Sequence, residues 1–130
     1  MEKPRHRTRA WAGIAAAAAL AGCTIGGDAI DRLSVDQQSE LAAYVGAYHF
    51  CVARTASQLD DGTSAIVDIS TAALDHCRPA ARGIDTYLDS IKLPEKDRAE
   101  YVAELTRSAA THSDIMLRHR RDRETGTGAI

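Results

Sequence analysis

The chain has 130 residues, a length that allows one small domain. Its 16 Lys and Arg against 18 Asp and Glu give a formal net charge of −2, which argues against a dedicated nucleic-acid-binding protein. Apolar residues make up 45% of the chain, yet 24 residues are alanine and only six are aromatic, so the composition excludes both disorder throughout and a large core.

The N-terminal 22 residues have the organisation of a secretory signal peptide. Four Lys and Arg residues lie between positions 3 and 9, and the ten residues Trp11–Leu20 then contain no charge. As a helix this apolar run is about 15 Å long, too short for a hydrocarbon core of about 30 Å. A basic start, a short apolar run and small residues at its end are typical of a segment that is removed after export.

The end of this segment is more specific than an ordinary cleavage site. Leu20-Ala21-Gly22-Cys23 resembles the lipobox of bacterial lipoproteins at all four positions. The resemblance implies that Cys23 receives a diacylglycerol thioether, that residues 1–22 are removed and that the new amino group is often acylated. Such acyl chains anchor a protein stably, since each buried methylene contributes about 0.8 kcal/mol. We therefore expect a periplasm-facing protein of the bacterial cell envelope. Lipoproteins that stay in the inner membrane tend to have Asp directly after the lipidated cysteine, so with Thr24 at that position the resemblance implies the outer membrane.

The mature chain is expected to be acidic, with 12 Lys and Arg against 17 Asp and Glu and a net charge of −5. Residues 23–33 are expected to be the lipidated N-terminus and a short polar tether, since they contain Gly26-Gly27. Residues 34–121 are expected to form a helical domain, and residues 122–130 a disordered tail that lacks apolar periodicity. An acidic body has no attraction to anionic lipid, so the acyl chains are the expected membrane contact.

The first helix is expected to run from near Val35 to Leu59. Ser34 and Gln37 have the spacing of a capping box. Asp60-Asp61-Gly62 predicts a turn, and Thr63 or Ser64 is expected to cap the next helix. Between these signals, residues at steps of three and four fall on one stripe: Leu41, Tyr44, Val45, Tyr48, Val52, Thr55, Ala56 and Leu59.

Two shorter helices and a long last one follow. Pro79 is expected to break or kink the chain between the two shorter helices, and Pro94 suits the start of the last. The apolar stripe of the second helix contains Ile66, Ile69, Ala73 and Cys77, and that of the third contains Ile84, Leu88 and Ile91. The stripe of the last helix is expected to contain Tyr101, Leu105, Ala109, His112 and Met116.

These elements predict an all-α fold. No segment alternates apolar and polar residues with β-branched side chains, as a half-buried strand does. Alanine-rich stripes let helices approach closely, which favours a small bundle of three to four helices, preceded by the helix of the signal peptide.

Cys51 and Cys77 remain once Cys23 is lipidated, and export delivers them to an oxidising compartment. An even pair on two helices joined by a tight turn predicts a disulfide and hence a disulfide-linked helical hairpin. The geometry is demanding, because Cys51 lies about 12 Å before the end of its helix and Cys77 about 20 Å after Ser64. The bond needs Cα atoms within about 7 Å, so the turn or a steep crossing must absorb the difference.

The alternative for this region is a metal site. His49, Cys51, His76 and Cys77 are the ligand types that zinc prefers. Residues two apart on a helix point about 200° apart and adjacent residues about 100° apart, so all four converge only if both helices are distorted. We therefore predict no metal and no cofactor.

No catalytic constellation is evident. Helical spacing scatters the residue types of a hydrolase triad, and no nucleophile elbow accompanies them. These residues are Ser70, Thr71, Asp75 and His76. The basic run Arg118–Arg121, with Arg123, is interpreted as favourable charge at a helix C-terminus plus a solvated tail, with contact to phosphate or an acidic partner as the alternative. We predict no catalytic residue and no enzymatic activity.

Residues 51–77, CVARTASQLDDGTSAIVDISTAALDHC, are similar to a Cys…Leu-Asp-Asp-Gly…Ser…Ile…Ala…Cys pattern found in small uncharacterised exported helical proteins of proteobacteria. The resemblance implies a helical hairpin closed by a disulfide, and it implies no activity.

Three functions follow from these observations. The first is a non-enzymatic, lipid-anchored module that binds another envelope protein and no nucleic acid. The second is a periplasmic inhibitor or immunity protein against a toxin or wall hydrolase, because an acidic face suits a basic enzyme. The third is a metal-binding protein that uses His49, Cys51, His76 and Cys77.

Overall fold

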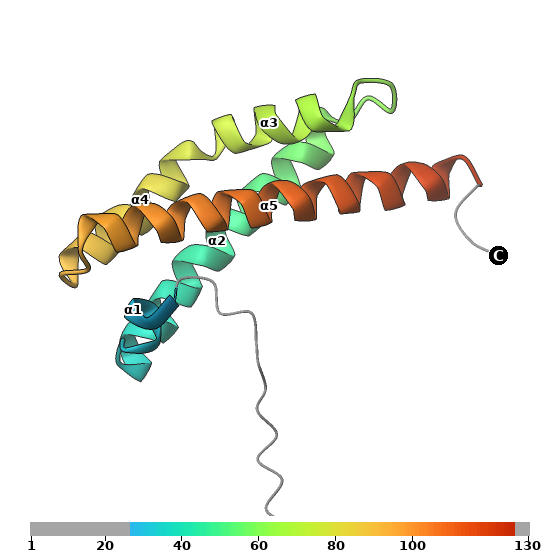
Figure 1. Ribbon diagram of the computed structural model, residues 1–130. Coiled ribbons are helices and arrows are strands. Elements are labelled where there is room, and N and C mark those ends of the chain that lie inside the picture. The colour runs from blue at the N-terminus through green and yellow to red at the C-terminus, as the bar shows by residue number, and fades with distance from the viewer. Residues whose placement is uncertain (1–26, 127–130) are drawn as a thin grey trace, which may run out of the picture.

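The computed structural model describes residues 27–126, which form five helices and contain no strand (Figure 1). These helices are α1 (Gly27–Asp31), α2 (Val35–Leu59), α3 (Ile66–His76), α4 (Arg78–Ser90) and α5 (Glu95–Glu124). Helices α3 and α4 follow one another, α5 runs back beside them in the opposite direction, and α2 packs against all three. The all-α bundle is thus confirmed, while the expected signal-peptide helix lies outside the described residues. Within residues 27–126, no helix combines the length and the apolar character of a membrane span.

Helix α2 begins and ends where the sequence predicts. The Ser34 side chain accepts a hydrogen bond from the Gln37 backbone N–H, and the Gln37 side chain accepts one from the Ser34 N–H, so both halves of the capping box are present. The predicted stripe forms the part of the core that α2 contributes, with these residues fully buried: Leu41, Tyr48, Val52 and Ala56. Two residues of the predicted stripe are exposed instead, so the prediction is wrong for them: Leu59 lies at the end of the helix, and Tyr44 stacks its ring on that of Tyr87 at the edge of the core.

The break between α3 and α4 lies at Cys77, which ends one helix and begins the other. Pro79 follows in the first turn of α4, where a missing N–H removes no helical hydrogen bond. The predicted stripes of both segments face the core, since their central residues are buried: Ile69, Ala73, Cys77, Ile84 and Leu88. Pro79 therefore turns the chain without exposing either stripe.

The last helix confirms its predicted stripe except at His112: Tyr101, Leu105 and Ala109 are buried, and Met116 is partly buried and packs against the core. Its buried residues are Tyr101, Leu105, Ala109, Ser113 and Leu117, all four residues apart. His112, expected in the stripe, is exposed, so that prediction is wrong. Steps of four advance about 40° around a helix each time, so the buried line drifts along α5. Its first half packs near α4 and its second half against α2 and α3, through contacts such as Met116 with Ser57.

Three local features differ from the sequence-based expectations. Part of the expected tether is helical, because Ala29 and Ile30 give α1 an apolar face that packs against the core, as does Leu33 just after the helix. The N-cap of α3 is Ala65, without a side-chain hydrogen bond, instead of Thr63 or Ser64. Helix α5 also continues to Glu124, three residues beyond the expected end of the domain.

Candidate functional site

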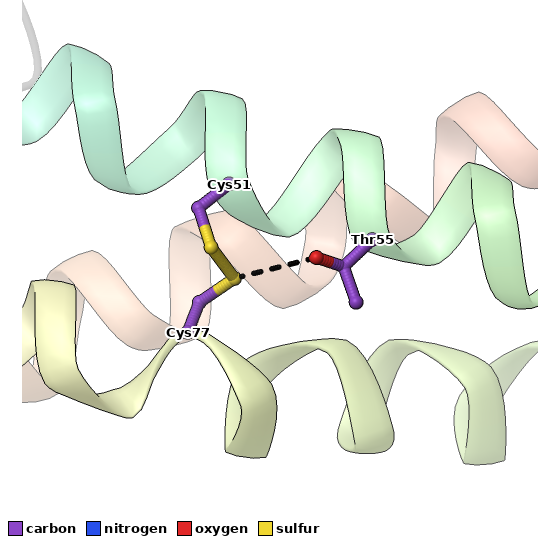
Figure 2. The surroundings of a disulfide bond; sticks show 3 residues. All are labelled: Cys51, Thr55 and Cys77. Carbon is purple, nitrogen blue, oxygen red and sulfur yellow. Dashed lines mark hydrogen bonds between the residues drawn. A yellow bond between two sulfur atoms is a disulfide. The ribbon is translucent and has the colours of Figure 1, made fainter.

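The disulfide joins the middle of α2 to the break between α3 and α4 (Figure 2). The Cα atoms of Cys51 and Cys77 are 6.0 Å apart, and Cys77 is 2% exposed. The Thr55 hydroxyl, one turn after Cys51, lies 3.7 Å from the Cys77 sulfur and can donate a weak hydrogen bond to it. The predicted bond is confirmed. Because α3 begins at Ile66, Cys77 lies only about 16 Å along it, and the loop between α2 and α3 absorbs the remaining difference.

The two histidines of the alternative metal site do not join the two cysteines. His49 is partly buried, and burial together with the nearby charge of His112 lowers the pKa of its imidazole. His76 is exposed at the end of α3. No three His, Cys, Asp or Glu side chains of residues 27–126 are grouped so that they could hold a metal ion. In the bonded form, moreover, neither sulfur is a thiolate that a zinc ion would bind.

The residue types of a hydrolase triad are dispersed along α3. Ser70 is buried and hydrogen-bonds to Asp114 and Ser113 of α5, so it holds the two helices together. The Thr71 hydroxyl donates to the backbone carbonyl of its own helix one turn earlier, and Asp75 forms an exposed ion pair with Arg78. The structure thus brings neither Asp75 nor His76 to either hydroxyl group. Nothing in this arrangement activates a nucleophile.

The basic run at the end of α5 has a structural role that the sequence analysis missed. Arg121 donates two hydrogen bonds to Asp60 and one to the carbonyl of Ser64, while Arg120 donates to the carbonyl of Ser57. The side chains of Asp60 and Arg121 are 2% and 19% exposed. The hydrogen bond from Arg121 lowers the pKa of Asp60. The end of the last helix is therefore fixed to the turn that joins α2 and α3, and the acidic turn facing a basic run was the sequence signal for it.

Asp61 organises the inside of the same turn. One of its carboxylate oxygens accepts hydrogen bonds from the backbone N–H groups of Thr63 and Ser64, and the other accepts the Ser64 hydroxyl. These bonds lower the pKa of Asp61 well below its usual range. They also explain why Ser64 does not cap α3, since its hydroxyl is already engaged.

A groove of about 510 Å³ lies where α3 bends into α4 against α5. Its lining is mainly apolar, with Leu74 from α3, Ala81 from α4 and Val102 from α5. Two arginines, Arg78 and Arg82, also line it. The sequence offered no motif for this groove, because its lining comes from four helices.

The outer face of α2 carries small residues around one large aromatic side chain. Phe50 is 66% exposed. One and two turns before it on the same face, four further residues are exposed: Ala42, Ala43, Gly46 and Ala47. Space around Gly46 is open, with no atom within 4 Å of the position a Cβ would take. We call these five residues the Phe50 face.

Comparisons with protein-family models, with curated proteins and with solved structures found no match to this chain. Cys23, the expected lipidation site, lies outside the described residues.

Proposed function

We propose that the protein is a non-enzymatic lipoprotein of the bacterial cell envelope that binds another envelope protein. The observation that carries the binding function is the Phe50 face. A phenylalanine side chain left 66% in water on a helix centre costs hydrophobic free energy that a partner recovers on binding. The small residues next to it allow the backbone of a second helix to approach closely.

The anchoring part of the proposal rests on the tetrapeptide Leu20–Cys23 and the apolar run before it. Growth with labelled palmitate is expected to label the protein, and Cys23→Ser is expected to abolish labelling and leave an uncleaved precursor. Cys51→Ser is the matched control, since it changes a cysteine outside the lipobox and should leave labelling intact. A Cys23→Ser protein that is still labelled and still cut after Gly22 would refute the lipid anchor.

The binding part is tested by placing a photo-crosslinking phenylalanine analogue at Phe50 in cells. The matched control carries the same analogue at Thr86, an exposed position of α4 whose side chain forms no hydrogen bond within the described residues. We expect a discrete adduct from position 50 and none from position 86. The adduct should disappear when Gly46 is changed to Trp, which blocks close approach of a partner. No adduct at position 50, or the same adducts at both positions, would refute this use of the Phe50 face.

A further inference from the structure

The groove between α3, α4 and α5 has one cation that is not used by the fold. Asp75 pairs with Arg78, and Asp85 pairs with Arg98 of α5. The side chain of Arg82, which is exposed at the same groove, forms no hydrogen bond or ion pair with any residue between 27 and 126. The carboxylates that line the groove are thus already paired, and Arg82 is the guanidinium left over for a ligand.

Three hydroxyl groups line the groove: those of Thr71 and Thr106 are engaged within their own helices, while that of Tyr48 forms no hydrogen bond with residues 27–126. The hydroxyl of Thr71 donates to the carbonyl of Val67, and the hydroxyl of Thr106 donates to the carbonyl of Val102. An extended peptide bound here would find no series of donors and acceptors for its backbone, and such a series is what holds peptides of this kind in place. The groove therefore fits a ligand that needs few hydrogen bonds.

The volume and chemistry of the groove define that ligand further. About 510 Å³ lies within the range of small-molecule sites, which are mostly apolar with a few polar groups that fix orientation. Leu74, Ala81 and Val102 supply apolar surface, and Arg82 supplies a planar donor fork that suits a carboxylate. A ligand with an anionic group at one end of an alkyl chain would match both the apolar surface and the guanidinium.

We propose that this groove binds a fatty acid, with the carboxylate on Arg82 and the alkyl chain along Leu74, Ala81 and Val102. The site lies apart from the Phe50 face, because Tyr48, the α2 residue that lines the groove, and Phe50 are two positions apart and point about 200° from each other. The proposal does not depend on lipidation of Cys23 or on a protein partner.

The test is a calorimetric titration of the full chain carrying Cys23→Ser, with its Cys51–Cys77 bond intact and without detergent. The probes are laurate, octanoate and dodecanol. We expect saturable one-to-one binding of laurate, weaker binding of octanoate by at least tenfold because four methylenes are lost, and weaker binding of dodecanol because it has no charge. Equal binding of laurate and dodecanol would overturn the role of Arg82, and absence of saturable laurate binding would overturn the site.

Two variants locate the binding. Arg82→Gln is expected to weaken laurate binding about tenfold, while Arg54→Gln, at an exposed position outside the groove, leaves it unchanged. Ala81→Leu fills the groove with a good helix former and is expected to abolish binding. Thermal melts of each variant establish that it is folded. Laurate binding that survives both Arg82→Gln and Ala81→Leu in folded protein would show that the ligand sits elsewhere.

Discussion

Removing the Cys51–Cys77 bond is expected to destabilise the protein by about 3.5 kcal/mol. The bond closes a loop of 26 residues, and the chain entropy that such a cross-link removes from the unfolded state corresponds to that free energy at 25 °C. A small domain has about 5–15 kcal/mol in total, so the bond supplies a large fraction of the stability. For about 100 folded residues the loss corresponds to a fall in Tm of about 15–25 °C.

The assay is urea unfolding of the oxidised protein, the reduced protein and the variant Cys51→Ala/Cys77→Ala, followed by circular dichroism. The reduced protein and the double variant should unfold at nearly the same urea concentration, well below that of the oxidised protein. Their m-values should also be larger, because an unfolded chain without the cross-link exposes more surface. The double variant treated with reductant is the control and should not change. A difference below about 1 kcal/mol between oxidised protein and double variant would refute the loop-entropy argument.

Further predictions concern the turn, the partly buried His49 and two glycines. Arg121→Ala is expected to cost about 2 kcal/mol in urea unfolding, because it leaves the nearly buried Asp60 carboxylate without its charged donor. Burial lowers the pKa of His49, so below about pH 6.5 the unfolded chain binds a proton at this residue more readily than the folded chain does. The free energy of unfolding should therefore decrease as the pH is lowered through this range, and His49→Gln should make that decrease smaller. Gly62 has a φ of +78°, so Gly62→Ala should destabilise by about 1 kcal/mol. Gly83→Ala, inside α4 with open space around it, should stabilise by about 0.5–1 kcal/mol, and a loss of stability there would contradict the helix argument.

The sequence determines those features that depend on a few neighbouring residues. The start of α2 was predictable because the capping box needs only Ser34 and Gln37, and the break before α4 because Pro79 cannot continue a helix. The pairing of Cys51 with Cys77 was predictable from the count of cysteines together with the oxidising compartment that the N-terminal segment leads us to expect. None of these features requires knowledge of where other helices lie.

The features that the sequence did not predict depend on distant partners. The buried line of α5 continues in steps of four to Ser113 and Leu117 because α5 changes neighbours along its length, whereas a regular amphipathic helix would return to His112. Arg121 contacts a turn 61 positions earlier in the chain, so its role needed the tertiary arrangement. The groove likewise assembles from separate helices, and no spacing of residues within one helix marks it.

The position of the disulfide also determines how the protein responds to mechanical force. A pulling force between the two ends of the described chain passes along the covalent chain from Cys51 to Cys77 directly through the bond, so the backbone between them is not stretched once the contacts with α5 have broken. Those 26 positions would add about 90 Å of extension in a chain without the bond, at about 3.4 Å per residue. Unfolding under load therefore starts in α1, the first part of α2, α4 and α5. The loop with α3 and the turn at Asp60 stays closed in a covalent ring and keeps the two halves of the hairpin within reach of each other when the load is released.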